Sequence, residues 1–372
     1  MKKIIGLALA IGLSLGCRET RSITSTEVGN AQSSADFQVS DAEAARIMQI
    51  VIQKIEAGED ISPNLTRMIQ IIMNKTGPDA SWQNLTVDAD KSANLKKKYS
   101  IYLGLYQKAL DSFNFVAGCD GLLFTSLLVA AGHEHDLSLA ESSEQPGRWY
   151  RSADHDCYPS GKSKSSISRD MLLGLSLALW QKSDGAAVKR ILQFSQKNKG
   201  ILGDAIDSQE LAGAATMSPS LLSMLSEMDF QINATNSDNR GYFPELGKNF
   251  SGFEAHLLAL RLTLKSSLYG GLLRTDAELI SSLAQKQPRN ALFQALNHAF
   301  TDGDGNAAAA ILLDEKLFPA TALPTSAQRC EPYLWQRDQK STDWLPCPEA
   351  GTTFPAVDFF WVYALLNSSF RR

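Results

Sequence analysis

The chain has 372 residues, of which 44% are hydrophobic and 20% are charged, and its formal net charge is −4. This composition is typical of a globular protein with one large domain, or a large domain with a small partner. It excludes the broad basic surface that nucleic-acid binding requires, so we expect no nucleic-acid partner. The one cationic run, Lys96-Lys97-Lys98, is interpreted as a solvated helix face.

Residues 1–17 have the layout of an export signal. Two lysines precede an apolar run from Ile4 to Leu15, and Gly16 and Cys17 follow at once. This segment resembles the signal peptide of bacterial lipoproteins, which implies cleavage before Cys17 and a diacylglycerol on its sulfur. The apolar run is too short for the roughly 20 residues of a spanning helix. The alternative is an ordinary secretory signal cut further on, for instance after Ala31.

The lipoprotein resemblance implies a location in the cell envelope, with the membrane as a partner through the N-terminal lipid. Arg18 rather than Asp follows the cysteine, which in a Gram-negative cell favours the outer membrane. Residues 18–39 are rich in Ser and Thr and poor in apolar residues. They are predicted to form a flexible tether, with an ordered arm along the domain as the alternative.

The remaining chain is predicted to be all-α. Ser40 and Glu43 form a capping box that opens a set of N-terminal helices over residues 40–115, which we expect to pack on the main domain of residues 116–372. Two segments of that domain are apolar on nearly all sides, which is typical of helices buried in the centre of a large protein. They run from Asp120 to Gly132 and from Ser168 to Trp180. Other helices are predicted over 94–113, 186–199, 219–228, 253–268, 276–285, 290–300, 306–317 and 356–367.

The alternation of very apolar with amphipathic segments suggests an inner ring of helices inside an outer ring. This pattern resembles the α/α-toroid, or six-hairpin barrel, of many bacterial carbohydrate-active enzymes. The rival architecture is a helical-repeat array, although the sequence has no repeat of fixed period.

The chain carries four cysteines beyond Cys17, an even number that favours disulfides in an exported protein. Three pairings are possible, and Cys119–Cys157 with Cys330–Cys347 is the one we favour. The sequence has no CxxC pair, so we expect no zinc knuckle and no metal site.

Three apolar helices begin with an aspartate in the same local position: Asp120, Asp170 and Asp358. If the inner helices run parallel, these carboxylates converge at one mouth, and two carboxyl groups are what glycoside hydrolysis requires. Arg169 could pair with Asp170 or with an anionic substrate. The competing interpretation is that each aspartate only stabilises the first turn of its own helix.

The loop of residues 147–168 concentrates polar chemistry between two apolar helices. Trp149 and Tyr150 are predicted to stack on the face of a sugar. Arg151 and Lys162 are predicted to bind carboxylates, and His155 and Asp156 to act as acid or base. Trp361, in the helix that follows Asp358, is a further substrate-binding candidate. The alternative is a surface loop held rigid by a disulfide.

These features lead to one main functional hypothesis and two alternatives. The main one is a lipid-anchored envelope protein that binds a glycan or acts on it, as a glycosidase or polysaccharide lyase without a cofactor. The first alternative is a non-enzymatic surface lipoprotein. A minor alternative is a metal-dependent phosphohydrolase using His133-Glu134-His135-Asp136 and His155-Asp156, a family that is also all-helical.

Overall fold

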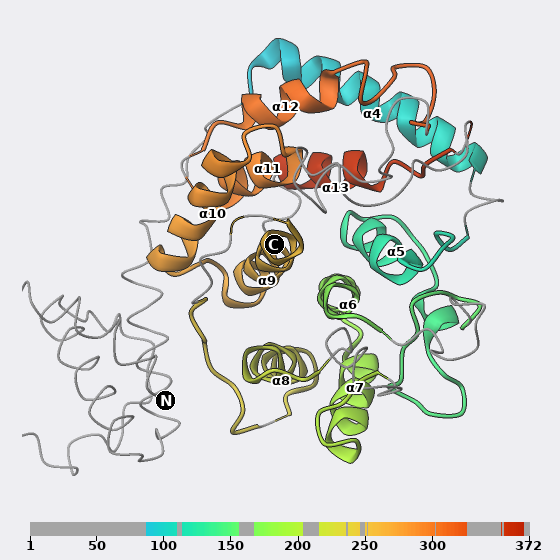
Figure 1. Cartoon of the computed structure of the whole chain (residues 1–372), viewed down its shortest axis with the longest axis vertical. Helices are drawn as coiled ribbons and strands as arrows, with labels where there is room; N and C mark the ends of the chain where they lie inside the picture. The colour runs from blue at the N-terminus through green and yellow to red at the C-terminus, as the bar shows by residue number, and fades with distance from the viewer. Residues whose placement is uncertain are drawn as a thin grey trace, which may run out of the picture. The chain divides into compact units, whose positions relative to one another are not determined.

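The chain divides into two units, Met1–Asp79 and Ala80–Arg372, and everything described below belongs to the second. A computed structural model describes residues 87–109, 114–155, 167–203, 216–235, 237–245, 250, 252–301, 303–325, 351 and 353–367 (Figure 1). Within these residues the protein is all-α, as predicted, because β-pairing is limited to isolated bridges such as Glu141–Trp149.

The described residues contain ten α-helices and one short 3-10 helix. The α-helices are α4 (Ala89–Ala109), α5 (Gly121–Ala130), α6 (Arg169–Lys182), α7 (Gly185–Lys197), α8 (Pro219–Asn233), α9 (Gly252–Tyr269), α10 (Arg274–Lys286), α11 (Ala291–Phe300), α12 (Gly305–Leu313) and α13 (Val357–Leu366), and the 3-10 helix is η2 (Leu137–Ala140).

Five of these helices contact one another in a closed cycle. Helix α5 contacts α6, α6 contacts α9, and α9 contacts α11. Helix α11 in turn contacts α13, and α13 contacts α5. Every residue of α5 is buried, and so are ten consecutive residues of α6. The other helices pack against members of the cycle: α7 on α6, α8 on α9, α10 on α9 and α11, and α4 and α12 on α13. Helices such as α7 and α10 bury only one face, which agrees with their amphipathic sequences.

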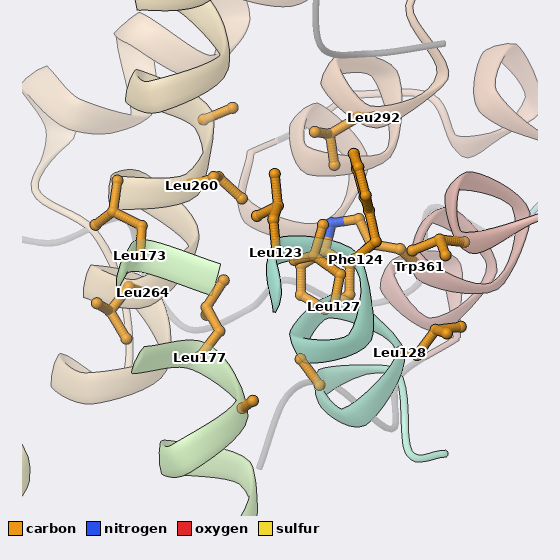
Figure 2. Close-up of a cluster of buried hydrophobic side chains, with 14 of the residues drawn as sticks. Leu123, Phe124, Leu127, Leu128, Leu173, Leu177, Leu260, Leu264, Leu292 and Trp361 are labelled. Carbon is orange, nitrogen blue, oxygen red and sulfur yellow. The ribbon is translucent and has the colours of Figure 1, made fainter. Parts of the chain in front are cut away.

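Large apolar side chains fill the space where the helices of this cycle meet. Figure 2 shows them: Leu123, Phe124, Leu127, Leu128, Leu173, Leu177, Leu260, Leu264, Leu292 and Trp361. All ten are buried, and full burial of one such side chain stabilises the fold by about 2 kcal/mol. Gly174 allows α6 to approach α5 closely, since a Cβ at this position would lie 2.7 Å from Cδ1 of Leu123.

Short polar side chains mark where several helices begin. Asp184 accepts a hydrogen bond from the backbone N–H of Ala187 at 2.9 Å, and Ser218 does the same for Leu221 at 3.2 Å. Asn290 caps α11 in this way. These bonds satisfy N–H groups that lack a partner within the helix, and so fix the start of each helix.

A buried cluster of charges holds the segment 237–245 against α9 and α10. The Lys265 ammonium is 1% exposed and lies 2.7 Å from Oε1 of Glu245 and 3.4 Å from Oδ2 of Asp276. The Tyr242 hydroxyl donates to Asp276 at 2.6 Å, and burial followed by the Asp276 charge raises the pKa of Tyr242. The guanidinium of Arg261 donates to the second carboxylate oxygen of Glu245 at 3.0 Å. The acidic and basic groups therefore compensate one another inside the protein.

Candidate functional site

The start of α6 lies beside the start of α9. Asp170 is 3% exposed, and one of its carboxylate oxygens accepts a hydrogen bond from the hydroxyl of Ser168. Its other oxygen is 3.9 Å from Nε2 of the fully buried His256. At the surface Arg169 pairs with Glu254 at 3.3 Å. His256 and Glu254 were not predicted from the sequence, because a histidine inside an apolar helix gives no signal of its own.

This arrangement differs from that of a catalytic triad. In a triad the histidine stands between the hydroxyl and the carboxylate, so that it can take the hydroxyl proton. Here the carboxylate of Asp170 stands between Ser168 and His256. The geometry therefore supports a role of Asp170 in joining the first turns of α6 and α9.

Asp120 and Arg151 pair with each other at the start of α5. The guanidinium of Arg151 lies 3.0 Å from Oδ1 of Asp120 and donates to the Cys119 carbonyl at 2.9 Å. The backbone N–H of Leu122 donates in turn to the carbonyl of Arg151 at 2.8 Å. Arg151, predicted to bind substrate, thus fastens its own loop to α5.

Asp358 lies apart from Asp120. Its carboxylate is 1% exposed and accepts the backbone N–H of Phe359. The next residue, Phe360, makes an edge contact with the ring of His133 at 4.6 Å, and His133 follows the C-terminal end of α5. The first turn of α13 therefore lies by that end, whereas Asp120 precedes the opposite end of a helix about 15 Å long. The expected convergence of three carboxylates at one mouth is wrong for this pair.

Both tryptophans predicted to contact a sugar are buried, so these two predictions are wrong as stated. Trp149 is 3% exposed and Trp361 is 0% exposed. The physical reason is the large apolar surface of tryptophan, because burying it inside the protein lowers the free energy of the folded state. Tyr150, the neighbour of Trp149, is half-buried instead and stacks on His155, with ring centroids 4.1 Å apart. Nε2 of His155 also bonds to the carbonyl of Leu139 at 2.9 Å.

A small pocket opens between the turn 145–148 and the end of α7. It has a volume of about 180 Å³ and is lined by Gln145, Arg148, Phe194, Asn198, Ile201 and Gly203. Arg148 donates to the side-chain oxygen of Gln145 at 3.0 Å, and its Cζ atom lies 5.1 Å from the centroid of the Tyr150 ring. The side-chain amide of Asn198 donates to the Phe194 carbonyl at 2.8 Å. An aromatic ring, two amides and a guanidinium therefore meet at one hollow.

A partly buried ion pair holds the wall of this pocket in place. Arg190 on α7 binds both oxygens of Glu141, at 2.7 and 2.6 Å, and the backbone N–H of Gly147 donates to the same carboxylate at 2.8 Å. A side chain at Gly147 would collide with the backbone of Arg190, and the φ of Gly147 is 88°. Only glycine fits this close approach. Sequence reasoning identified the loop but missed the pocket, since α7 and the residues that follow it supply four of the six lining residues.

The histidines behind the phosphohydrolase alternative lie just after α5. The Tyr106 hydroxyl bonds to Nε2 of His135, whose Nδ1 lies 2.9 Å from the Asn114 carbonyl. Burial, followed by the charge of His135, lowers the pKa of His133 to about 4. Among the residues that the structure describes, no three His, Cys, Asp or Glu side chains are grouped to hold a metal ion.

Several predictions fall on residues outside the described ranges. These are Cys17 with its signal peptide, the tether, Asp156, Lys162, and the cysteines at 157, 330 and 347. The pairing of Cys119 with Cys157 therefore stays a prediction. None of the helices within the described ranges has the length and apolar character needed to cross a membrane.

Comparison of the chain with protein-family models, with curated proteins and with solved structures finds no match. The function is therefore inferred from the geometry described above.

Proposed function

We propose that this protein is a lipid-anchored component of the cell envelope whose helical domain binds a glycan. Anchoring rests on residues 1–17, with the basic start, apolar run and Gly16-Cys17 ending of a lipoprotein signal. Binding rests on one observation, the pocket between the turn 145–148 and α7.

The lining of the pocket suits a sugar. A sugar ring has an apolar face that packs on an aromatic side chain, here Phe194, and a rim of hydroxyls that need hydrogen-bond partners. The amides of Gln145 and Asn198 can both donate and accept, and Arg148 adds a planar array of donors. Binding sites in general combine apolar walls with a few polar groups that fix orientation.

The geometry favours binding over hydrolysis or elimination. Glycoside hydrolysis needs two carboxyl groups about 5–10 Å apart and accessible to substrate. Asp170 and Asp358 are buried in their own helix starts, and Asp120 is paired with Arg151. Each of the three carboxylates therefore has a structural role where it lies.

The helix contacts also support an α/α-toroid-like arrangement as part of this proposal. The closed cycle of α5, α6, α9, α11 and α13, with amphipathic helices against it, is what two concentric layers require. In this arrangement the buried leucines of the cycle form the core, and the glycan binds at the periphery, beside α7.

The test is binding of the full chain, in detergent micelles, to a panel of bacterial envelope glycans. We expect at least one glycan to bind, and Asn198→Ala to weaken that binding by about tenfold, because one charge-neutral hydrogen bond contributes about 1 kcal/mol and its loss leaves a sugar hydroxyl unpaired. The matched control is Asp170→Asn, which should bind as the unaltered chain does.

Two results would contradict the proposal. One is that no glycan on the panel binds to the folded chain. The other is that Asp170→Asn abolishes glycan binding, or abolishes the release of products from a glycan, while circular dichroism shows an unchanged helix content. That result would place the site at the start of α6.

A further inference from the structure

Among the described residues, three cationic side chains lie at or next to the glycan pocket. Arg148 lines the pocket itself, and Lys197 and Lys199 are exposed on either side of Asn198, which also lines it. Glu144 precedes Gln145 and is exposed. A second acidic residue before this turn, Glu141, has a side chain that is 9% exposed and is bound through both oxygens by Arg190, so its charge is compensated.

We infer that this pocket takes an acidic sugar, a glycan unit that carries a carboxylate. The inference rests on the proposed function and adds the chemical class of its ligand. A guanidinium binds a carboxylate through two parallel N–H···O bonds, which are about twice as strong as neutral hydrogen bonds. Exposed lysines nearby raise the local concentration of anions.

The size of the pocket limits what enters it. Its volume, about 180 Å³, is below the roughly 300–1,000 Å³ of sites that enclose drug-sized ligands. One sugar ring fits, and the rest of the glycan lies outside the pocket. We place the ring against Phe194 and its carboxylate at Arg148, since these residues line the same hollow.

The pocket is also built to hold its shape without a ligand. The turn that carries Arg148 is fixed to α7 by the Glu141–Arg190 pair and by the bond from Gly147. Arg148 is further oriented by Gln145 and by the ring of Tyr150. A preorganised guanidinium loses less freedom on binding than a mobile one, which favours affinity for a rigid carboxylate.

The experiment compares three probes on the full chain by isothermal titration calorimetry: oligogalacturonate, a neutral galactose oligosaccharide of equal length, and free galacturonate. We expect oligogalacturonate to bind about ten- to a hundredfold more tightly than the neutral oligosaccharide, the range that one charge-assisted contact of about 1.5–3 kcal/mol supplies. Free galacturonate should bind as well, because the pocket holds a single sugar ring.

Two variants make the test specific. Arg148→Gln should abolish the preference for the acidic probe over the neutral one. Arg274→Gln is the matched control, because Arg274 is 84% exposed on α10 and pairs with Glu278 one turn along the same helix. This variant should leave the affinities for the acidic and the neutral probe unchanged. The preference should also shrink as salt rises from 50 to 500 mM, since salt screens exposed charges.

The outcomes separate the two proposals. Equal binding of acidic and neutral probes, or an acidic preference that survives in Arg148→Gln, would overturn the inference and leave glycan binding intact. Failure of all three probes, together with failure of the envelope panel, would overturn the glycan proposal as well. Both variants must retain the helix content and melting temperature of the unaltered chain.

Discussion

His133 occupies a site that disfavours its charged form. Its ring contacts Tyr106 at 5.2 Å and Phe360 at 4.6 Å between centroids. Its Nε2 atom is buried and has no hydrogen-bond partner within the described residues. Burial, then the neighbouring His135, lowers the pKa of His133 from 6.5 to about 4. The folded protein therefore holds this ring neutral.

The stability of the protein should depend on pH through this residue. Because the unfolded chain binds the proton with the ordinary pKa, it holds more protons than the folded chain between pH 6.5 and 4. The free energy of unfolding should therefore fall as the pH drops through this window, by about 2–3 kcal/mol. Urea unfolding of the unaltered chain and of His133→Phe at pH 7.5 and 4.5 measures the difference, and the variant should lose less stability.

A control for this experiment is His155→Asn. His155 is half-buried in the loop and has a φ of 56°, a conformation that asparagine tolerates. This variant should keep the pH dependence of the unaltered chain. If His133→Phe keeps it as well, the account of His133 is wrong.

The segment 237–245, between α8 and α9, is held in place by buried charges more than by apolar packing. Phe243 in this segment is 43% exposed, whereas Lys265, which bonds to its carbonyl, is buried. Glu245 and Asp276 supply the counter-charges. Such pairs add little net stability relative to apolar residues, but removing one partner leaves the others uncompensated.

Lys265→Met should therefore destabilise the protein by about 3–5 kcal/mol, because Asp276 and Glu245 lose the buried cation that they share, although Arg261 still pairs with Glu245. Arg274→Gln breaks an exposed pair and should cost less than about 1 kcal/mol. Thermal and chemical unfolding of both variants gives the comparison. Equal effects of the two substitutions would show that the cluster does not hold this segment.

Several helices were predicted closely because they carry a local signal. The predicted 253–268 and 290–300 lie within a residue or so of α9 and α11, where an apolar period and Asn290 as a cap coincide. The prediction of 306–317 ran too far. In the structure α12 ends at Leu313, and Asp314 turns the chain by accepting the backbone N–H of Lys316.

The site was harder to predict, because it depends on contacts between distant residues. From the sequence alone, Trp149 and Tyr150 are equally plausible as rings that stack on a sugar. In the structure, the Glu141–Trp149 bridge turns Trp149 inward, whereas Tyr150 stays half-buried. The pocket joins Gln145 to Asn198, and no local pattern relates these two positions. The buried partner of Asp170, His256, is also remote in sequence.

At the scale of the whole molecule, the lipid anchor that we propose would bring the proposed glycan pocket to the membrane surface. A single acyl chain binds a membrane only marginally, whereas the several chains of a lipoprotein bind firmly. A tether of 22 residues would span about 25 Å on average, which lets the domain reach glycans near that surface.

The anchor is tested by mass spectrometry of the N-terminal peptide of the mature protein from membranes. We expect it to begin at Cys17 and to carry acyl groups, and Cys17→Ser to lose labelling with a radioactive fatty acid. A mature chain that begins after Ala31 without lipid would show that the signal is an ordinary secretory one.

Amide hydrogen exchange with the bound glycan tests the central claim most directly, because it locates the site without a substitution. The account predicts that the glycan slows exchange in residues 145–148 and 194–203, on either side of the pocket, and leaves the starts of α6 and α9 unchanged. Protection of residues 168–170 and 253–256, with none at the pocket, would contradict it.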